Sequence, residues 1–151
     1  MTTTATRPQM AGVGIGLRLG AGAALGASAA IHIHLWDTGY RHIPTIGPLF
    51  LLQSVTGVVL ALAVFSAPGA WSGLAGLAGA GFLISTAAGM VLSAEVGLFG
   101  FKDSYSAPWT KASLAVEVIG AVLGLAMAAR SLRTHSFRPA GTDAGAKEEA
   151  K

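Results

Sequence analysis

The stretch TIGPLFLLQSVTGVVLALAVF, residues 45–65, decides the fold, because it contains no charged side chain along its whole length. A helix needs about 20 mainly apolar residues to cross a bilayer, since hydrocarbon offers the backbone no hydrogen-bond partner. Similar stretches lie at about residues 15–36, 71–94 and 108–129. The sequence therefore predicts an all-α, polytopic membrane protein with four transmembrane helices.

The overall composition excludes an ordinary soluble domain. Hydrophobic residues make up 52% of the 151 residues and charged residues only 11%, whereas roughly a quarter of a soluble domain is charged. The chain has no cysteine, which excludes disulfide scaffolds, thiolate metal sites and cysteine nucleophiles. The formal charge of +3 is spread thinly without a basic patch, so we expect no nucleic-acid partner.

Short connectors between the spans favour an antiparallel four-helix bundle. Gly39 and Pro44 break the chain after the first span. Ser106 followed by Pro108 is typical of an N-cap before a first-turn proline, and Thr45 is typical of a capped helix start. We therefore expect the fourth helix to begin at about residue 108.

Lysine and arginine residues predict the orientation of the bundle. Seven of the ten lie on the side of the two termini, and such residues favour the cytoplasm when they flank short loops. We expect a plasma-membrane protein with both termini in the cytoplasm. The expected organisation is an N-terminal segment over residues 1–14, a transmembrane domain over residues 15–132, and a disordered tail over residues 133–151.

Two kinds of side chain mark the bilayer boundaries. Arg18 lies inside the first span near its inner end, where a long side chain can reach the headgroups. Aromatic residues typical of an interfacial belt gather at the outer boundary: Trp36, Tyr40, Phe99, Phe101, Tyr105 and Trp109. Polar residues expected near the outer headgroups are His34, Asp37, Arg41, His42, Glu95, Lys102 and Asp103.

An alternative topology comes from Ala27-Ser28-Ala29, which resembles a signal-peptidase site after an apolar run. Cleavage there would leave three spans and would expose the following His-rich segment outside. The position of Arg18 and the weak Gly-Ala-rich core favour the uncleaved chain with four spans.

Small residues recur every four positions in three of the spans and predict close helix packing. Helices associate in a bilayer through small residues, because lipid tails are as apolar as leucine. A four-residue row drifts around a helix with 3.6 residues per turn, so only two or three members serve one crossing. The packing candidates are Gly16, Gly20, Gly81, Ser85, Gly89, Gly120 and Gly124.

A layer of polar groups lies at one depth, about 12 Å below the outer anchors at about 1.5 Å per residue. It offers a group from each span: Ser28, Gln53, Ser85 with Thr86, and Glu117. His32 lies one turn above Ser28 on the same face. A charged carboxylate at this depth costs several kcal/mol, so we expect Glu117 to be protonated, paired or hydrated.

Two roles remain open for this layer, whose candidates for proton or ligand binding are Glu117, His32, Gln53, Thr86 and Ser28. A neutral Glu117 hydrogen-bonded to Gln53 would join two helices and contribute about 1 kcal/mol. An ionised Glu117 would have His32 as its nearest partner, and such a pair could carry a proton or bind a cation.

The segment His32-Ile33-His34 suggests a metal or haem ligand pair, but its spacing argues against one. Residues two apart on a helix are separated by about 200°, so the two rings point to different sides. A metal site would have to combine His32 or His34 with carboxylates such as Glu95. A haem held by two histidines would need a second histidine at similar depth, and no other span supplies one.

Three segments resemble small four-span membrane proteins of high-GC actinobacteria: HIHLW at residues 32–36, GYRHIPTIGPLFLLQ at residues 39–53, and GLFGF at residues 97–101. The resemblance covers about residues 32–117. It implies a four-span architecture and a plasma-membrane location, and it implies no activity and no catalytic residue.

Three functions follow as hypotheses. The first is a small integral membrane protein that binds a proton, a cation or a small ligand in an outward-facing polar pocket. The alternative is a structural or assembly subunit whose glycine-rich faces pack against another membrane subunit or a second copy. The third is a redox protein linked to haem or quinone. No catalytic motif has supporting context, so we assign no reaction.

Overall fold

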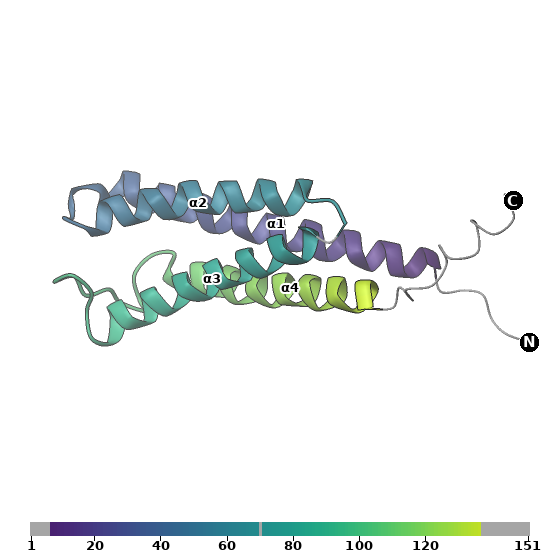
Figure 1. The fold of residues 1–151 in the computed structure, drawn as a ribbon. Helices are drawn as coiled ribbons and strands as arrows, with labels where there is room; N and C mark the ends of the chain where they lie inside the picture. Colours follow the sequence, from purple (N-terminus) through teal and green to yellow (C-terminus); the bar gives the residue numbers. More distant parts are fainter. Residues whose placement is uncertain (1–6, 70, 137–151) are drawn as a thin grey trace, which may run out of the picture.

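The computed structural model describes residues 7–69 and 71–136 (Figure 1). Its helices are α1 (Arg7–Thr38), α2 (Ile46–Ser66), α3 (Trp71–Glu95) and α4 (Thr110–Ser136), with a short 3-10 helix, η1 (Tyr40–His42), between the first two. All four α-helices are long and apolar enough to cross a membrane. The prediction of an all-α, multi-pass membrane protein with a four-helix bundle is confirmed.

Two helices extend beyond the predicted spans. Helix α1 begins at Arg7 rather than near residue 15, and α4 continues to Ser136, into the expected disordered tail. Apolar length indicates how much of a helix suits hydrocarbon and does not mark where the helix ends. Pro8 lies in the first turn of α1, where a missing N–H costs nothing. The rest of the predicted tail lies outside the described residues.

Helix α4 also begins later than predicted. Ser106 does not cap it, because the Ser106 hydroxyl hydrogen-bonds to the Ser104 hydroxyl at 2.8 Å. Trp109 has a φ of 68°, which no helix residue adopts, and α4 begins at the next residue. Thr45 has a φ of 67° and precedes α2 without a side-chain cap. The two expected caps are therefore backbone turns.

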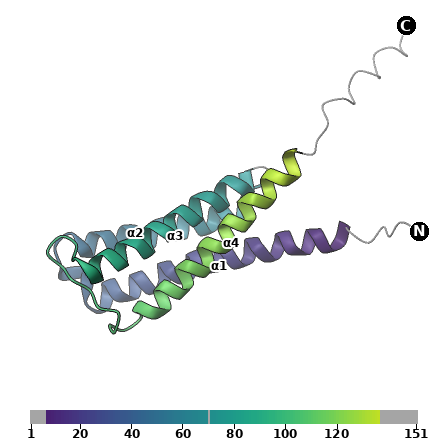
Figure 2. The same cartoon turned by 90° about the horizontal axis from the view of Figure 1, so that it is seen from below.

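The bundle consists of two hairpins. Helices α3 and α4 pack closely, as do α1 and α2, and the hairpins are joined mainly through α1 and α4, while α2 and α3 touch much less. Figure 1 shows the α1–α2 pair beside the α3–α4 pair, and Figure 2 shows α4 crossing α1 obliquely. We call the end with residues 39–45 and 96–109 the loop end. The start of α1 and the end of α4 lie at the opposite end.

Glycines bring α3 and α4 into backbone contact. A Cβ at Gly124 would lie 2.7 Å from the Gly76 carbonyl oxygen, and a Cβ at Gly76 would lie 2.8 Å from the Gly124 carbonyl oxygen. Gly73 and Gly79 lie one turn to either side of Gly76 and are buried with it. A Cβ at Gly73 would meet Ser131 of α4, whereas a Cβ at Gly79 would meet Leu25 of α1. The buried glycines of α3 therefore recur every three residues rather than the predicted four.

The predicted packing residues divide into two groups. Gly20 and Gly120 lie against Leu123 and Ala24 respectively, and Gly124 meets α3. The other predicted packing residues make no close contact with another helix of this chain. A Cβ at Gly16, Gly81 or Gly89 would meet nothing within 4 Å, and Ser85 is exposed and donates its hydroxyl to the Phe82 carbonyl of its own helix.

Arg18 has a more specific role than reaching the headgroups. Its guanidinium donates to the carbonyl of Ala67, the C-cap residue of α2. The last carbonyls of a helix lack an intrahelical partner and carry partial negative charge, so a cation stabilises them. Arg18 thereby joins α1 to the end of α2.

Candidate functional site

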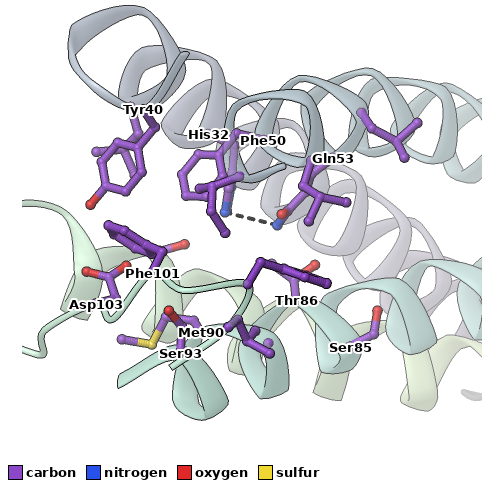
Figure 3. A pocket seen from close by; sticks show the side chains of 18 of the residues that line it. His32, Tyr40, Phe50, Gln53, Ser85, Thr86, Met90, Ser93, Phe101 and Asp103 are labelled. Atoms are coloured by element: carbon purple, nitrogen blue, oxygen red, sulfur yellow. Dashed lines mark hydrogen bonds between the residues drawn. The ribbon is translucent and has the colours of Figure 1, made fainter. Parts of the chain in front are cut away.

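A cavity of about 420 Å³ occupies the loop-end half of the bundle between α2 and α3, and we call it the seam pocket. Its walls come from residues 46–56 of α2 and residues 82–93 of α3. His32 of α1 and Ser113 of α4 also line it. Phe101 and Asp103, from the loop between α3 and α4, lie at its loop end (Figure 3). The pocket exists because α2 and α3 make the sparsest contact between successive helices.

The mouth of the seam pocket faces sideways. Leu49 and Leu52 line it and are 41% and 61% exposed, and Ser85 lines it from the facing helix and is also exposed. These residues belong to membrane-spanning segments, so their exposed faces meet hydrocarbon rather than water. A molecule dissolved in the bilayer can therefore enter between α2 and α3.

His32 connects the pocket to the interior of the bundle. Its Nδ1 lies 2.8 Å from the Ser28 carbonyl oxygen, and its Nε2 lies 2.9 Å from the Gln53 side-chain nitrogen. A carbonyl oxygen only accepts, so Nδ1 carries a proton, and the Nε2 of a neutral ring then accepts from the Gln53 amide. The ring is thus held by α1 and α2 together.

Glu117 lies directly behind His32 and is 1% exposed. Its Oε1 accepts from the Ser113 hydroxyl at 2.9 Å and from the Ser28 hydroxyl at 3.4 Å, and it lies 4.0 Å from His32 Nε2. Among the described residues, the second carboxylate oxygen has no hydrogen-bond partner. Gln53, His32 and Glu117 therefore form a polar chain across α2, α1 and α4.

The predicted polar layer is brought together only in part. Ser28, His32, Gln53 and Glu117 meet, but Glu117 does not bond to Gln53, because the His32 ring lies between them. Thr86 lines the seam pocket and donates its hydroxyl to the Phe82 carbonyl of its own helix, without touching this chain. The layer therefore joins three helices, and α3 supplies the facing wall.

The candidate metal ligands His32, His34 and Glu95 do not come together. His34 is exposed and its ring packs edge-on against Trp109 at 5.5 Å, while Glu95 accepts from the Tyr105 hydroxyl at 2.9 Å. Within residues 7–69 and 71–136, no three His, Cys, Asp or Glu side chains are grouped to hold a metal ion. Both ring nitrogens of His32 have protein partners, so this residue does not fit an axial haem ligand either.

Sequence reasoning missed the residues that cover the pocket. Tyr40 and Phe101 were expected in the aromatic belt at the outer boundary, and both also line the seam pocket. The Tyr40 ring stacks on Phe50 at 4.7 Å and meets Phe101 edge-on at 5.6 Å. Asp103, expected at headgroup level, lines the same end of the pocket (Figure 3).

A tight turn places these residues. Leu98 and Phe101 exchange both backbone hydrogen bonds, at 2.7 and 2.8 Å, around Phe99 and Gly100. Both central residues have positive φ, 52° and 79°, as in a type I′ turn. The glycine after an apolar residue is the only local signal for this turn. The turn folds the loop back over the mouth of the bundle.

Comparison with known proteins does not extend this description. No protein family matches the chain, and no curated protein or solved structure matches it either.

Proposed function

We propose that this protein is an integral membrane binding protein that holds a small amphipathic molecule in the seam pocket. The main support for this proposal is a cavity of about 420 Å³ with mainly apolar walls and a few convergent polar groups. Small-molecule sites usually have this form. The polar part of the ligand would lie against polar side chains of the pocket, and its apolar part would lie along α2 and α3.

The buried carboxylate gives this pocket a second property. His32 touches the pocket on one side and lies 4.0 Å from Glu117 on the other. An ionisable group in a membrane interior is a functional candidate by default, because its charge is costly there. A ligand that bonds to Gln53 therefore alters the hydrogen bond that orients the His32 ring beside Glu117.

The proposal places the loop end outside the cell. Seven of the ten lysines and arginines belong to the side of the two termini, which favours cytoplasmic termini in a plasma membrane. With this orientation, the seam pocket opens in the outer leaflet.

Filling the pocket tests the proposal directly. Gly89 lines the pocket, and a Cβ there would meet nothing within 4 Å, so Gly89→Phe adds a ring to the cavity without a backbone clash. Gly81→Phe is the matched control, because Gly81 is equally free on the same helix and does not line the pocket. We expect mass spectrometry to find a co-purified small molecule in the wild type and in Gly81→Phe, and to find it strongly depleted in Gly89→Phe.

Equal content in all three proteins would contradict the proposal, provided that the two variants keep the thermal unfolding midpoint of the wild type.

A second candidate function, an assembly subunit, is favoured by one observation. Gly16 and Gly81 are exposed, and a Cβ at either would meet nothing within 4 Å, so these faces are free to meet another membrane subunit or a second copy. Gly124 is unsuitable as a probe of this function because α3 already occupies its contact. Gly16→Leu is expected to lower cross-linking in native membranes, and unchanged cross-linking would argue against this function.

A further inference from the structure

The loop end of the seam pocket has a single charge. Asp103 is the one charged residue among the side chains that line the pocket, apart from the titratable His32. One of its carboxylate oxygens accepts from the Ser104 N–H at 2.7 Å. Among the described residues Asp103 forms no ion pair. The exposed Arg41 at the same end of the bundle pairs with Asp37 instead. The pocket is therefore negative at this end.

Aromatic rings surround the same space. Tyr40, Phe50 and Phe101 all line it, and the Tyr40 ring contacts both phenylalanine rings. Figure 3 shows Tyr40 and Phe101 beside Asp103 at one end, with Gln53 and Thr86 toward the other. The faces of aromatic rings attract cations, and the attraction grows when the site is desolvated. Burial and the negative charge of Asp103 both raise the pKa of Tyr40, so this ring lies close to the carboxylate.

A buried hydroxyl without a partner lies beside them. Ser93 is 6% exposed and lines the pocket, and within the described part of the chain its hydroxyl has no hydrogen-bond partner. The Asp103 N–H donates to the Ser93 carbonyl oxygen at 3.3 Å, which keeps the two residues adjacent. Buried polar atoms are seldom left unpaired, so this hydroxyl is an independent sign that a polar group of a ligand belongs here.

We propose that the loop end of the seam pocket binds the head of an organic ammonium whose apolar body extends between α2 and α3. Asp103 neutralises the charge, the rings of Tyr40 and Phe101 surround it, and Ser93 accepts from an ammonium N–H. This inference rests on the proposed function and adds the chemical class of the ligand. A free lipophilic amine and the ethanolamine headgroup of a phospholipid share this chemistry.

The test uses the full chain in an uncharged maltoside detergent and three probes of similar size. These are 2-phenylethylammonium, the neutral 2-phenylethanol and the anionic 3-phenylpropanoate, each titrated by equilibrium dialysis. We expect saturable binding of the ammonium with one site per chain, and binding of the other two at least about tenfold weaker, because neither supplies a cation to pair with Asp103. Equal binding of the ammonium and the alcohol would overturn the proposal.

Variants assign the binding to named residues. Asp103→Asn is expected to weaken ammonium binding at least about tenfold, and Phe101→Leu about threefold to tenfold, as expected when a cation–π contact is lost. Asp37→Asn is the matched control, because this aspartate is exposed, lies at the same end and does not line the pocket. Wild-type affinity in Asp103→Asn would overturn the proposal. If Asp103→Asn fails to fold, the affinity of Phe101→Leu still tests it.

Two further arms separate the outcomes. If Gly89→Phe abolishes binding of ammonium and alcohol alike while Asp103→Asn affects neither, the seam pocket binds a ligand but not through its charge, so this inference fails and the proposed function stands. Displacement of the bound probe by phosphatidylethanolamine but not by phosphatidylglycerol would support the inference and identify a lipid headgroup as the source. Lack of displacement by either lipid, with Asp103-dependent binding intact, would support it and identify a free amine.

Discussion

Adding one methyl group at Gly124 tests whether α3 and α4 touch backbone to backbone in the membrane. The new Cβ would lie 2.7 Å from the Gly76 carbonyl oxygen and 3.1 Å from the Ala80 Cβ, whereas ordinary contact begins at 3.4 Å. Neither neighbour is the end of a flexible side chain. The two helices must therefore separate by about 0.7 Å at this crossing, and such a gap forfeits a quarter to a half of the dispersion energy of each affected contact.

Two effects set the size of the change. Overpacking of a tight interior costs about 1–3 kcal/mol, and alanine stabilises a helix by roughly 0.5–1 kcal/mol relative to glycine. We therefore expect Gly124→Ala to lower the free energy of unfolding by about 1 kcal/mol, the difference between these two effects. Gly81→Ala has only the second effect, because its Cβ meets nothing within 4 Å.

The assay is unfolding of the purified protein in maltoside micelles by increasing fractions of dodecyl sulfate, followed by helical circular dichroism. Gly20→Ala should fall between the other two variants, since its Cβ meets only the end of the flexible Leu123 side chain, at 2.8 Å. The expected order of stability is Gly81→Ala above Gly20→Ala above Gly124→Ala. Equal midpoints for Gly124→Ala and Gly81→Ala would refute the backbone contact between α3 and α4.

The remaining predictions concern three polar groups. Glu117→Leu removes the acceptor of two serine hydroxyls and should cost about 1 kcal/mol in the same assay, at ~0.6 kcal/mol per interhelical hydrogen bond. Glu117→Gln keeps an acceptor oxygen, so its free energy of unfolding should stay within about 0.5 kcal/mol of that of the wild type. Equal losses of stability in Glu117→Leu and Glu117→Gln would contradict this account. Arg18→Met removes the donor to the Ala67 carbonyl and should cost about 0.5–1.5 kcal/mol, with partial recovery in Arg18→Lys; a neutral effect would mean that the contact is not formed. Burial and the charge of Asp103 disfavour the phenolate of Tyr40 and raise its pKa, so it should ionise above pH 10.0 in an ultraviolet titration. Asp103→Asn should move that midpoint to lower pH, and an unmoved midpoint would place the carboxylate elsewhere.

The architecture could be predicted because it depends on apolar length alone. A mainly apolar stretch such as residues 45–65 has one stable environment, and the four-helix count follows from four such stretches. Depth could also be predicted, since the rise per residue is constant, and this is why Ser28, His32, Gln53 and Glu117 meet. The helix ends could not, because polar residues outside hydrocarbon continue a helix as readily as apolar ones.

Rotation of each helix about its axis was not predictable, and it decides which side chains touch. Gly76 and Gly81 are equally small and lie on one helix, yet only Gly76 faces α4. Thr86 shares the depth of the polar layer but bonds to its own helix.

The residues that cover the pocket were missed for a different reason. A single turn at residues 98–101 redirects Phe101 inward, and aromatic residues near a bilayer surface face lipid only on average.

The sparse contact between α2 and α3 also has a mechanical consequence. The α1–α4 contact joins the two hairpins, whereas the α2–α3 contact is sparse. The hairpins therefore separate most easily along the α2–α3 edge. An occupant that widens this edge increases the cross-sectional area of the protein at the loop end while leaving the opposite end unchanged. Its binding therefore does work against the lateral pressure of one leaflet. Affinity should consequently rise with membrane tension and fall when lipids of negative spontaneous curvature crowd the acyl-chain region, even though no residue of the protein changes.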